Sequence, residues 1–388
     1  MEMGNVLLLK RETVFGSQAN SALEVGLIGC GMRGALDASK FKANAGVRFV
    51  ALHDPFQDAL DRTRQKLEVP GARLYHGLNG YRELLASSLD AVIITSPPYF
   101  HPEQAAAAVD AGKHVFLAKP VAVDVAGTNS IAASGRKAEG KLSFLTDFWF
   151  EADWSFQECA ARVKRGDIGT PAVVQAYYHA PRLNPRAQPG LPASETRLRN
   201  WVFDKVLSGD IIVEQDARVL GDLYWFLGTT PLKAGGTGGR KVRVDVGDCW
   251  DNFVVCYDYA GGVRVDFSAS QFTIGFNDIC VRIFGSAGTL EAHHYDFPPN
   301  HASVVAITGD HPWNPEAEPG GKGSLPSNAK RFVESIRSRQ YLNNAAESVN
   351  INLTAILGRM AAYKGTVVTW AEMMRSGEKY ELSLPGIG

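Results

Sequence analysis

The sequence predicts an α/β protein of two domains: a doubly wound parallel sheet, then an α+β domain with a large, mainly antiparallel open sheet. Apolar strand-like segments alternate with helical segments from residue 22 to residue 150. After residue 150 the alternation stops, and strand pairs joined by glycine turns follow. A length of 388 residues is enough for two domains that each bury a core. We therefore expect an N-terminal arm over 1–21, a first domain over 22–150 and a second domain over 151–388.

The composition favours a globular protein without a charged polymer as partner. Lys and Arg number 40 against 41 Asp and Glu, so neither a nucleic acid nor a membrane surface is expected to bind. The five cysteines are scattered, without the spacing of a zinc site or a disulfide framework. We expect reduced thiols, no bound metal and a cytoplasmic location. In the arm, a short apolar run precedes a Lys-Arg pair, the reverse of the order in a signal peptide.

The first domain opens with "LEVGLIGCGMRG", an apolar strand that leads into a glycine-rich turn and a helix. Gly29, Gly31 and Gly34 form the pattern G-x-G-x-x-G, whose backbone N–H groups can approach a pyrophosphate at a helix N-terminus. Asp54 ends the next strand, where its carboxylate would accept hydrogen bonds from ribose hydroxyls and repel a 2′-phosphate. This context predicts a Rossmann domain that binds NAD. NADP stays an alternative because three basic residues are near the motif: Arg33, Arg62 and Arg64.

Two later loops follow strand ends, at the edge where open α/β sheets bind ligands. The first loop, Ser96-Pro97-Pro98, ends a strand over 91–95. The second loop, Lys119-Pro120, follows a strand over 114–117. Proline holds the residue before it extended, so we predict that Lys119 is a fixed functional cation rather than a solvated loop lysine. The cofactor contacts we predict are Gly29, Gly31, Met32, Arg33, Asp54, Ser96, Pro97, Pro98, His101, Ala118 and Lys119.

The second domain begins with a helix over about 152–164 and continues with strand-like segments. The segments over 251–272 and 279–294 are typical of hairpins that turn at glycines. A closing helix over 348–363 has periodic apolar residues and is expected either to stay in this domain or to pack back on the first.

The segment over 208–228 has apolar residues every three or four positions, which predicts one helix with a buried stripe. On a neighbouring face Glu214, Arg218 and Asp222 stand four residues apart. Two interpretations are open: an ion-pair ladder on the surface of an ordinary helix, or a face that lines an active site.

These blocks together resemble the Gfo/Idh/MocA oxidoreductases, the family of glucose–fructose oxidoreductase and inositol dehydrogenase. The resemblance rests on "VGLIGCGMRG", "SPPYFHPEQAAAAVDAGKHVFLAKPVAVD", "RNWVFDKVLSGDIIVEQ", "GTGGR" and "ILGRMAAY", which occur in the expected order. It implies oxidation of a ring hydroxyl of a sugar or polyol by hydride transfer to NAD or NADP. It also implies that Lys119 matches the lysine of the family's E-K-P motif, and that Glu214 and Arg218 match its acid and histidine.

The matched positions depart from the family pattern at the reacting centre. E-K-P is Ala118-Lys119-Pro120 here, the expected histidine is Arg218, and the aspartate expected three residues later is Gly221. Arginine cannot act as a base near neutral pH. The proton of the substrate must therefore leave by another group, for which the candidates are Lys119, Glu214 and His179, the last on a strand expected to face the cleft.

Three residues are candidates for substrate binding. Arg218 would anchor an acidic or polar group such as a sugar carboxylate. Trp201 would stack on a sugar, or else close the seam between the domains as a core side chain, and Asn200 would bond a hydroxyl. His293, His294 and His301 show no carboxylate spacing typical of a metal site.

We therefore expect an NAD(P)-dependent sugar or polyol dehydrogenase with a small carbohydrate as substrate. Two alternatives remain: glycoside cleavage or epimerisation with a retained cofactor, and a non-catalytic sensor of NAD and sugar. An open sheet face in the second domain predicts a homo-oligomer, either a dimer or a tetramer.

Overall fold

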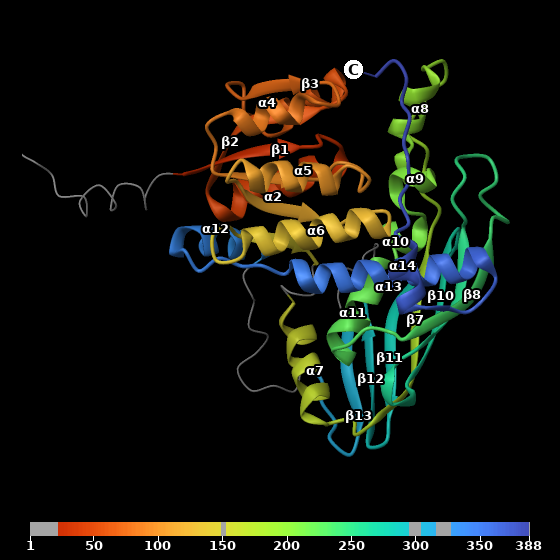
Figure 1. Ribbon diagram of the computed structural model, residues 1–388. Coiled ribbons are helices and arrows are strands. Elements are labelled where there is room, and N and C mark those ends of the chain that lie inside the picture. The colour runs from red at the N-terminus through yellow and green to blue at the C-terminus, as the bar shows by residue number, and fades with distance from the viewer. Residues whose placement is uncertain (1–21, 149–152, 295–303, 316–326, 388) are drawn as a thin grey trace, which may run out of the picture.

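The structure, a computed structural model, describes residues 22–148, 153–294, 304–315 and 327–387. The predicted arm over 1–21 and the predicted domain boundary at residue 150 lie outside the described residues. Two sheets lie one above the other in Figure 1, with helices around the first sheet and long helices between the two. The predicted fold class is confirmed. Among the described residues, no helix is long and apolar enough to cross a membrane.

The first sheet is parallel throughout, in the order β3-β2-β1-β4-β5-β6. The strand order reverses between β1 and β4, which is where a doubly wound sheet binds its ligand. Strand β4, at the centre of the sheet, is buried along its whole length, as its continuous apolar run requires. The strands are β1 (Leu23–Ile28), β2 (Val47–Asp54), β3 (Arg73–His76), β4 (Ala91–Ile94), β5 (His114–Ala118) and β6 (Phe144–Asp147).

Helices cover both faces of this sheet. On one face Phe41 of α2 and Phe116 of β5 pack edge to face, with ring centroids 4.8 Å apart, and Phe332 of α12 packs on both. The other face carries α4, α5 and α6. The helices are α2 (Met32–Ala45), α3 (Gln57–Lys66), α4 (Gly80–Ala86), α5 (His101–Asp110), α6 (Val125–Ala138) and α12 (Asn328–Ser338).

The second sheet has eight strands in the order β13-β12-β11-β7-β10-β9-β8-β14. It is antiparallel except for the pair β7 and β10. Buried and exposed residues alternate along β9 and β10, so one face packs on the core and the other is open. The strands are β7 (Pro171–Ala180), β8 (Lys233–Gly239), β9 (Asn252–Asp258), β10 (Arg264–Gln271), β11 (Asp278–Gly285), β12 (Gly288–His293), β13 (Val304–Gly309) and β14 (Val368–Thr369).

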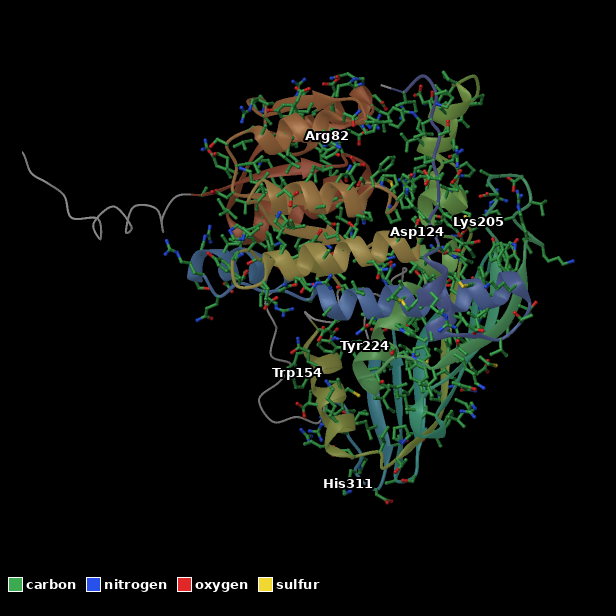
Figure 2. All side chains as sticks on the ribbon, viewed as in Figure 1. Arg82, Asp124, Trp154, Lys205, Tyr224 and His311 are labelled. Carbon is green, nitrogen blue, oxygen red and sulfur yellow. The ribbon has the colours of Figure 1, made fainter. Side chains whose placement is uncertain are left out.

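Long helix α13 (Ala345–Lys364) lies between the two domains, where it packs on α6 and on the second sheet. Fifteen of its residues are buried, so its packed surface reaches almost all the way round and one apolar core runs through both domains. The other helices of this half are α7 (Trp154–Arg165), α8 (Ala193–Arg199), η2 (Trp201–Phe203), α9 (Lys205–Ser208), α10 (Ile211–Glu214), α11 (Ala217–Leu227), η3 (Ala260–Gly262) and α14 (Trp370–Ser376). Figure 2 labels His311 at the bottom of this half, Trp154 at the upper end of α7, and Arg82 near the opposite end of the molecule.

The prediction of one helix over 208–228 is wrong, because the chain forms α10 and then α11 with Gln215 and Asp216 between them. Asp216 N donates to Ile211 O, one residue further back than in an α-helix, and Arg218 N donates to Gln215 O, one residue nearer. Compared with an α-helix, the turn that ends at Asp216 is thus wider and the turn that ends at Arg218 is tighter. Gln215 also accepts a hydrogen bond from Gln271 of β10 at 2.6 Å, a tertiary contact that helical periodicity does not report.

Candidate active site

The turn between β1 and α2 forms a cradle for an anion. Gly29 has a φ of +94°, and a Cβ there would come within 2.6 Å of Ser96 N, so only glycine fits. Gly31 is the N-cap of α2 and makes no side-chain cap, and a Cβ on it would meet nothing within 4 Å. Open space therefore borders the positive end of α2, as a bound pyrophosphate requires.

Asp54 at the end of β2 is held in place by two backbone donors. Cys30 N donates to its Oδ2 at 2.8 Å and Phe56 N to its Oδ1 at 2.9 Å. Burial raises the pKa of Asp54 to about 6, in opposition to these two hydrogen bonds. Each carboxylate oxygen keeps a further acceptor position, which suits a ribose diol.

A cavity of about 760 Å³ extends from the glycine turn past Asp54, within the range of small-molecule sites. Six predicted cofactor residues line it: Gly29, Gly31, Met32, Asp54, Ser96 and Pro97. The second domain supplies Arg199 and Trp201 to the same lining. NAD fits this arrangement of the glycine turn, the N-terminus of α2, the carboxylate of Asp54 and the cavity.

The basic residues that kept NADP open as an alternative are paired with carboxylates. Arg62 binds Asp58 and Arg64 binds Asp61 on the same helix. Arg33 contacts Asp37 at 2.6 Å and also Asp147 at the end of β6, and it is not part of the cavity lining.

His101 is not a cavity residue, contrary to its prediction as a cofactor contact. It is buried, and its two ring nitrogens each lie 2.8 Å from a backbone carbonyl, one of Ser96 and one of Pro120. Burial lowers the pKa of His101 to about 4, although the two carbonyls oppose this shift, so the ring is neutral and its single N–H donates to one of the two carbonyls. His101 therefore ties the loop after β4 to the loop that carries Lys119. Pro98, Ala118 and Lys119 are likewise absent from the cavity lining.

Lys119 follows β5 and lies beside Glu214, among other charged side chains. Its Nζ donates to the backbone carbonyl of Glu214 and lies 3.9 Å from Glu214 Oε1, with both side chains about 15% exposed. Burial lowers the pKa of Lys119 to about 8; Glu214 opposes this shift, and Arg218 adds to it. The lysine is thus poised to exchange a proton near neutral pH.

Asp216 belongs to the same group, and the sequence analysis missed it. Its side chain is 1% exposed, and neither carboxylate oxygen has a hydrogen-bond partner among the described residues. Burial raises the pKa of Asp216 well above its usual range, while Lys119 opposes that shift. Tyr178 of β7 faces this group, and burial raises its pKa to about 12. The signal that could have identified Asp216 is an acidic residue within a largely apolar segment, "IIVEQDARVL".

His179 does not join this group, so its predicted role in the cleft is wrong. Neighbouring residues of a strand point to opposite faces, and Tyr178 takes the inner one. His179 lies on the open face, where its Nδ1 is 2.8 Å from Ser270 Oγ and its Nε2 is 3.2 Å from Ser268 Oγ.

Trp201 and Asn200 lie by the cofactor cavity rather than beside Lys119. Trp201 is part of the cavity lining. Asn200 Oδ1 accepts hydrogen bonds from the backbone N–H groups of Arg186 and Ala187, at 2.7 and 3.0 Å. The side chain of Asn200 thus fixes the backbone of the loop that contains Arg186 and Ala187.

The ion-pair ladder is not the arrangement of the charged face. Glu214 pairs with Lys119, and Asp222 pairs with His294, both members of that pair being 1% exposed. The sequence shows no metal-like spacing around His293 because the side chains that approach it lie on the neighbouring strand. Antiparallel pairing of β11 and β12 brings Asp278 Oδ1 to 2.9 Å from its Nδ1 and Cys280 Sγ to 3.6 Å from its Nε2.

Two family models match the sequence of the chain, one in each half. The model for the oxidoreductase family with an NAD-binding Rossmann fold matches residues 23–145, and the GFO/IDH/MocA C-terminal domain matches 156–291. The chain belongs to the Gfo/Idh/MocA oxidoreductase family. NAD is accordingly the cofactor of its first domain.

Individual relatives are distant from this member of the family. The chain is 24% identical to a myo-inositol 2-dehydrogenase of Thermotoga maritima over 273 residues, 70% of this chain and 75% of that protein. It is 27% identical to an inositol 2-dehydrogenase of Ralstonia nicotianae over 251 residues, 63% of this chain and 66% of that protein.

Solved structures share the fold over both domains. An aldose-aldose oxidoreductase from Caulobacter crescentus, complexed with glycerol, superposes with a TM-score of 0.72 at 17% identity. The match covers 90% of this chain and 100% of that one. A scyllo-inositol dehydrogenase from Lactobacillus casei, with NAD(H) and scyllo-inositol bound, gives 0.69 at 19% identity with the same coverage.

Proposed function

We propose that this protein is an NAD-dependent dehydrogenase that oxidises a ring hydroxyl of a polyol, a sugar or a sugar acid. The observation that carries the proposal is the pairing of Lys119 with Glu214 at the end of β5, one loop away from the NAD cradle. The names of the inositol dehydrogenase relatives support a cyclic polyol or sugar as the substrate class.

Lys119 takes the hydroxyl proton in this proposal. Its lowered pKa supplies a useful fraction of neutral amine at neutral pH, and Glu214 at 3.9 Å steadies the ammonium that forms. Bound NAD supplies the hydride acceptor. The proton then passes from Lys119 to solvent, so that no histidine is needed at position 218.

Arg218 selects the substrate rather than moving a proton. A guanidinium stays charged and presents a planar fork, which suits a carboxylate or a pair of hydroxyls. Its charge also lowers the pKa of Lys119. A sugar acid is therefore the substrate that gains most from Arg218.

The arginine at a position where the family has histidine also favours a second candidate, a sensor that binds NAD and sugar without turnover. Both candidates use the same cradle, and they differ in whether Lys119 reacts.

The test is NADH absorbance at 340 nm with inositols, neutral sugars, sugar acids and glycosides as separate classes. We expect a rise with one class, and a loss of about 100-fold or more in kcat for Lys119→Met, the usual size of an acid–base contribution. Lys141→Met removes an exposed lysine and is expected to leave kcat unchanged. No rise with any class, while NADH fluorescence shows binding, would contradict the dehydrogenase. Product analysis on the glycosides would then separate cleavage with retained cofactor from a sensor.

Self-association through the open face of the second sheet is also proposed. Four apolar side chains of that face are at least 38% exposed: Val173, Val254, Phe284 and Val304.

A further inference from the structure

One wall of the NAD cavity comes from the second domain, between β7 and α9. This segment lines the cavity opposite α2 and α3 through Arg186, Gln188, Leu191, Leu198, Arg199 and Trp201. Figure 1 shows α8 and α9 standing beside the first domain, with the C-terminal tail running along them.

Arg199 reaches from the end of α8 to the first domain. Its Nη2 lies 2.8 Å from Asp58 Oδ1 and its Nη1 3.3 Å from Asp58 Oδ2, a two-pronged contact. The guanidinium carbon lies 3.9 Å from the ring centroid of Phe56, close enough for a cation–π interaction. Asp58 and Phe56 both line the cavity, so this contact lies at its rim.

The segment is braced as a unit around this contact. Asn200 Oδ1 holds the backbone of Arg186 and Ala187, and Glu195 Oε1 lies 2.8 Å from Arg199 Nε. Arg197 donates to Ser383 O at 3.2 Å, which joins the segment to the C-terminal tail. The Arg199–Asp58 pair must therefore break if this segment moves away from the first domain.

We propose that residues 186–201 form a cover over the adenosine side of the NAD cavity, and that the Arg199–Asp58 pair is its latch. The latch slows both entry and release of NAD, because each requires the cover to open. A cofactor held in this way exchanges more slowly than the size of the cavity alone would allow. The inference rests on NAD binding and not on the proposed dehydrogenation, so the two can fail separately.

Stopped-flow fluorescence tests the latch without any substrate. The enzyme is loaded with NADH and mixed with excess NAD⁺, and energy transfer from tryptophan, including Trp201 in the cavity wall, reports release. We expect Arg199→Gln to raise the release rate by about tenfold, the effect of losing a favourable two-pronged ion pair with a cation–π contact. Asp58→Asn should raise it at least as much, because Asp58 also pairs with Arg62, and adding Arg199→Gln to Asp58→Asn should change the rate little further.

A matched control removes an equivalent charge from α3. Arg64 pairs with Asp61 at 3.0 Å and lies outside the lining of the NAD cavity, so Arg64→Gln should leave both rates unchanged. Thermal melts of all variants verify that each is folded.

The rates separate a latch from a direct ligand. A latch slows entry and release together, so Arg199→Gln should raise both rate constants and change Kd by less than either. Faster release with unchanged entry, and a Kd that rises equally, would make Arg199 a direct contact of NAD and overturn the latch. Unchanged rates in Arg199→Gln would overturn it as well.

Discussion

At the scale of single residues, Lys119 has its basicity set by opposing neighbours. Burial and Arg218 lower its pKa, and Glu214 raises it, with a net value of about 8. A lysine accepts a proton only in its neutral form, which predominates above its pKa. The rate of substrate oxidation should therefore rise with pH and level off above about 8.

The two neighbours should move this pH profile in opposite directions. Glu214→Gln removes the charge that raises the pKa, so the midpoint of kcat/KM against pH should fall below that of the wild type. Arg218→Gln removes a charge that lowers it, so the midpoint should rise. Both are measured with NAD saturating and the best substrate of the panel. Midpoints that stay together, or that move in the reverse order, would show that Lys119 is not the titrating group.

At the scale of secondary-structure elements, two loops are joined by His101. Its nitrogens face carbonyls of Ser96 and Pro120, so the loop after β4 fixes the loop after β5. The neutral ring donates one N–H, so His101→Phe would leave one buried carbonyl without its donor, at about 1–3 kcal/mol. We expect a loss of about 1–3 kcal/mol in the free energy of unfolding and a lower kcat, since the loop that carries Lys119 loses part of its support.

Urea denaturation and the NADH assay measure these two effects. His76→Asn is the control, because His76 is exposed and should change stability by no more than about 0.5 kcal/mol. An unchanged kcat in His101→Phe would mean that the loop holds Lys119 without this link.

Strands and hairpins were predictable because their signals are local. The segment over 251–272 was predicted as a hairpin, and β9 and β10 pair around the turn at Ala260–Gly262. The break between α10 and α11 was not predictable, because Gln215 is fixed by Gln271, 56 residues away. His179 was misplaced for a related reason: alternation shows that a strand has two faces and does not show which one meets the cleft.

The candidate site divides in the same way. The glycine turn, Asp54 and Lys119 carry sequence patterns whose chemistry is local. Arg199 stood in an arginine-rich stretch, but its partner Asp58 is 141 residues earlier in the chain. No spacing rule connects them, and only the packing of the two domains does.

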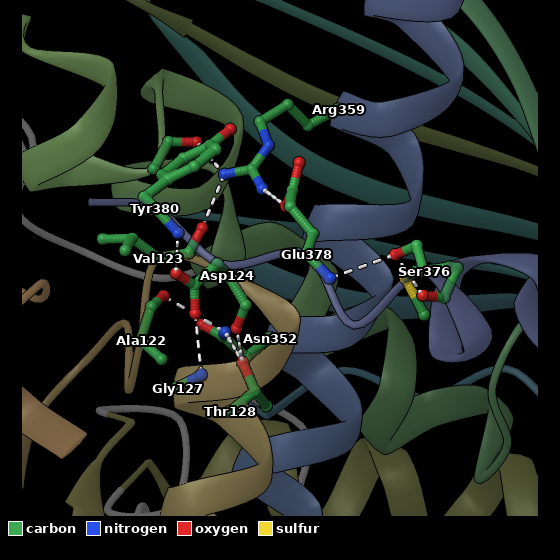
Figure 3. A network of polar contacts seen from close by, with 12 residues as sticks. Ala122, Val123, Asp124, Gly127, Thr128, Asn352, Arg359, Ser376, Glu378 and Tyr380 are labelled. Atoms are coloured by element: carbon green, nitrogen blue, oxygen red, sulfur yellow. Dashed lines mark hydrogen bonds and ion pairs between the residues drawn. The ribbon is translucent and has the colours of Figure 1, made fainter.

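At the scale of the whole molecule, a buried arginine joins both domains to the C-terminal tail. Arg359 of α13 is 1% exposed and donates to Val123 O at 2.6 Å and to Gly209 O at 2.8 Å. It also pairs with Glu378, and Tyr380 N donates to Asp124 Oδ2 at 2.7 Å. Figure 3 shows these groups converging where α6, α13 and the tail meet. The first domain, the second domain and the tail thus share one polar network.

This network should make the two domains unfold together. If either domain unfolds alone, Arg359 loses a carbonyl partner, Val123 O in the first domain or Gly209 O in the second. Arg359→Met keeps the apolar stem and removes the donors, which leaves two carbonyls and Glu378 without their partner. Each of the two buried carbonyls left without a donor costs about 1–3 kcal/mol. We expect that loss in urea, together with a split of one transition into two as the first domain and the sheet domain unfold separately. Glu378→Gln keeps an acceptor for Arg359 and should lose about 1 kcal/mol with a single transition. A single transition in Arg359→Met would show that the continuous apolar core around α13 is enough to couple the domains.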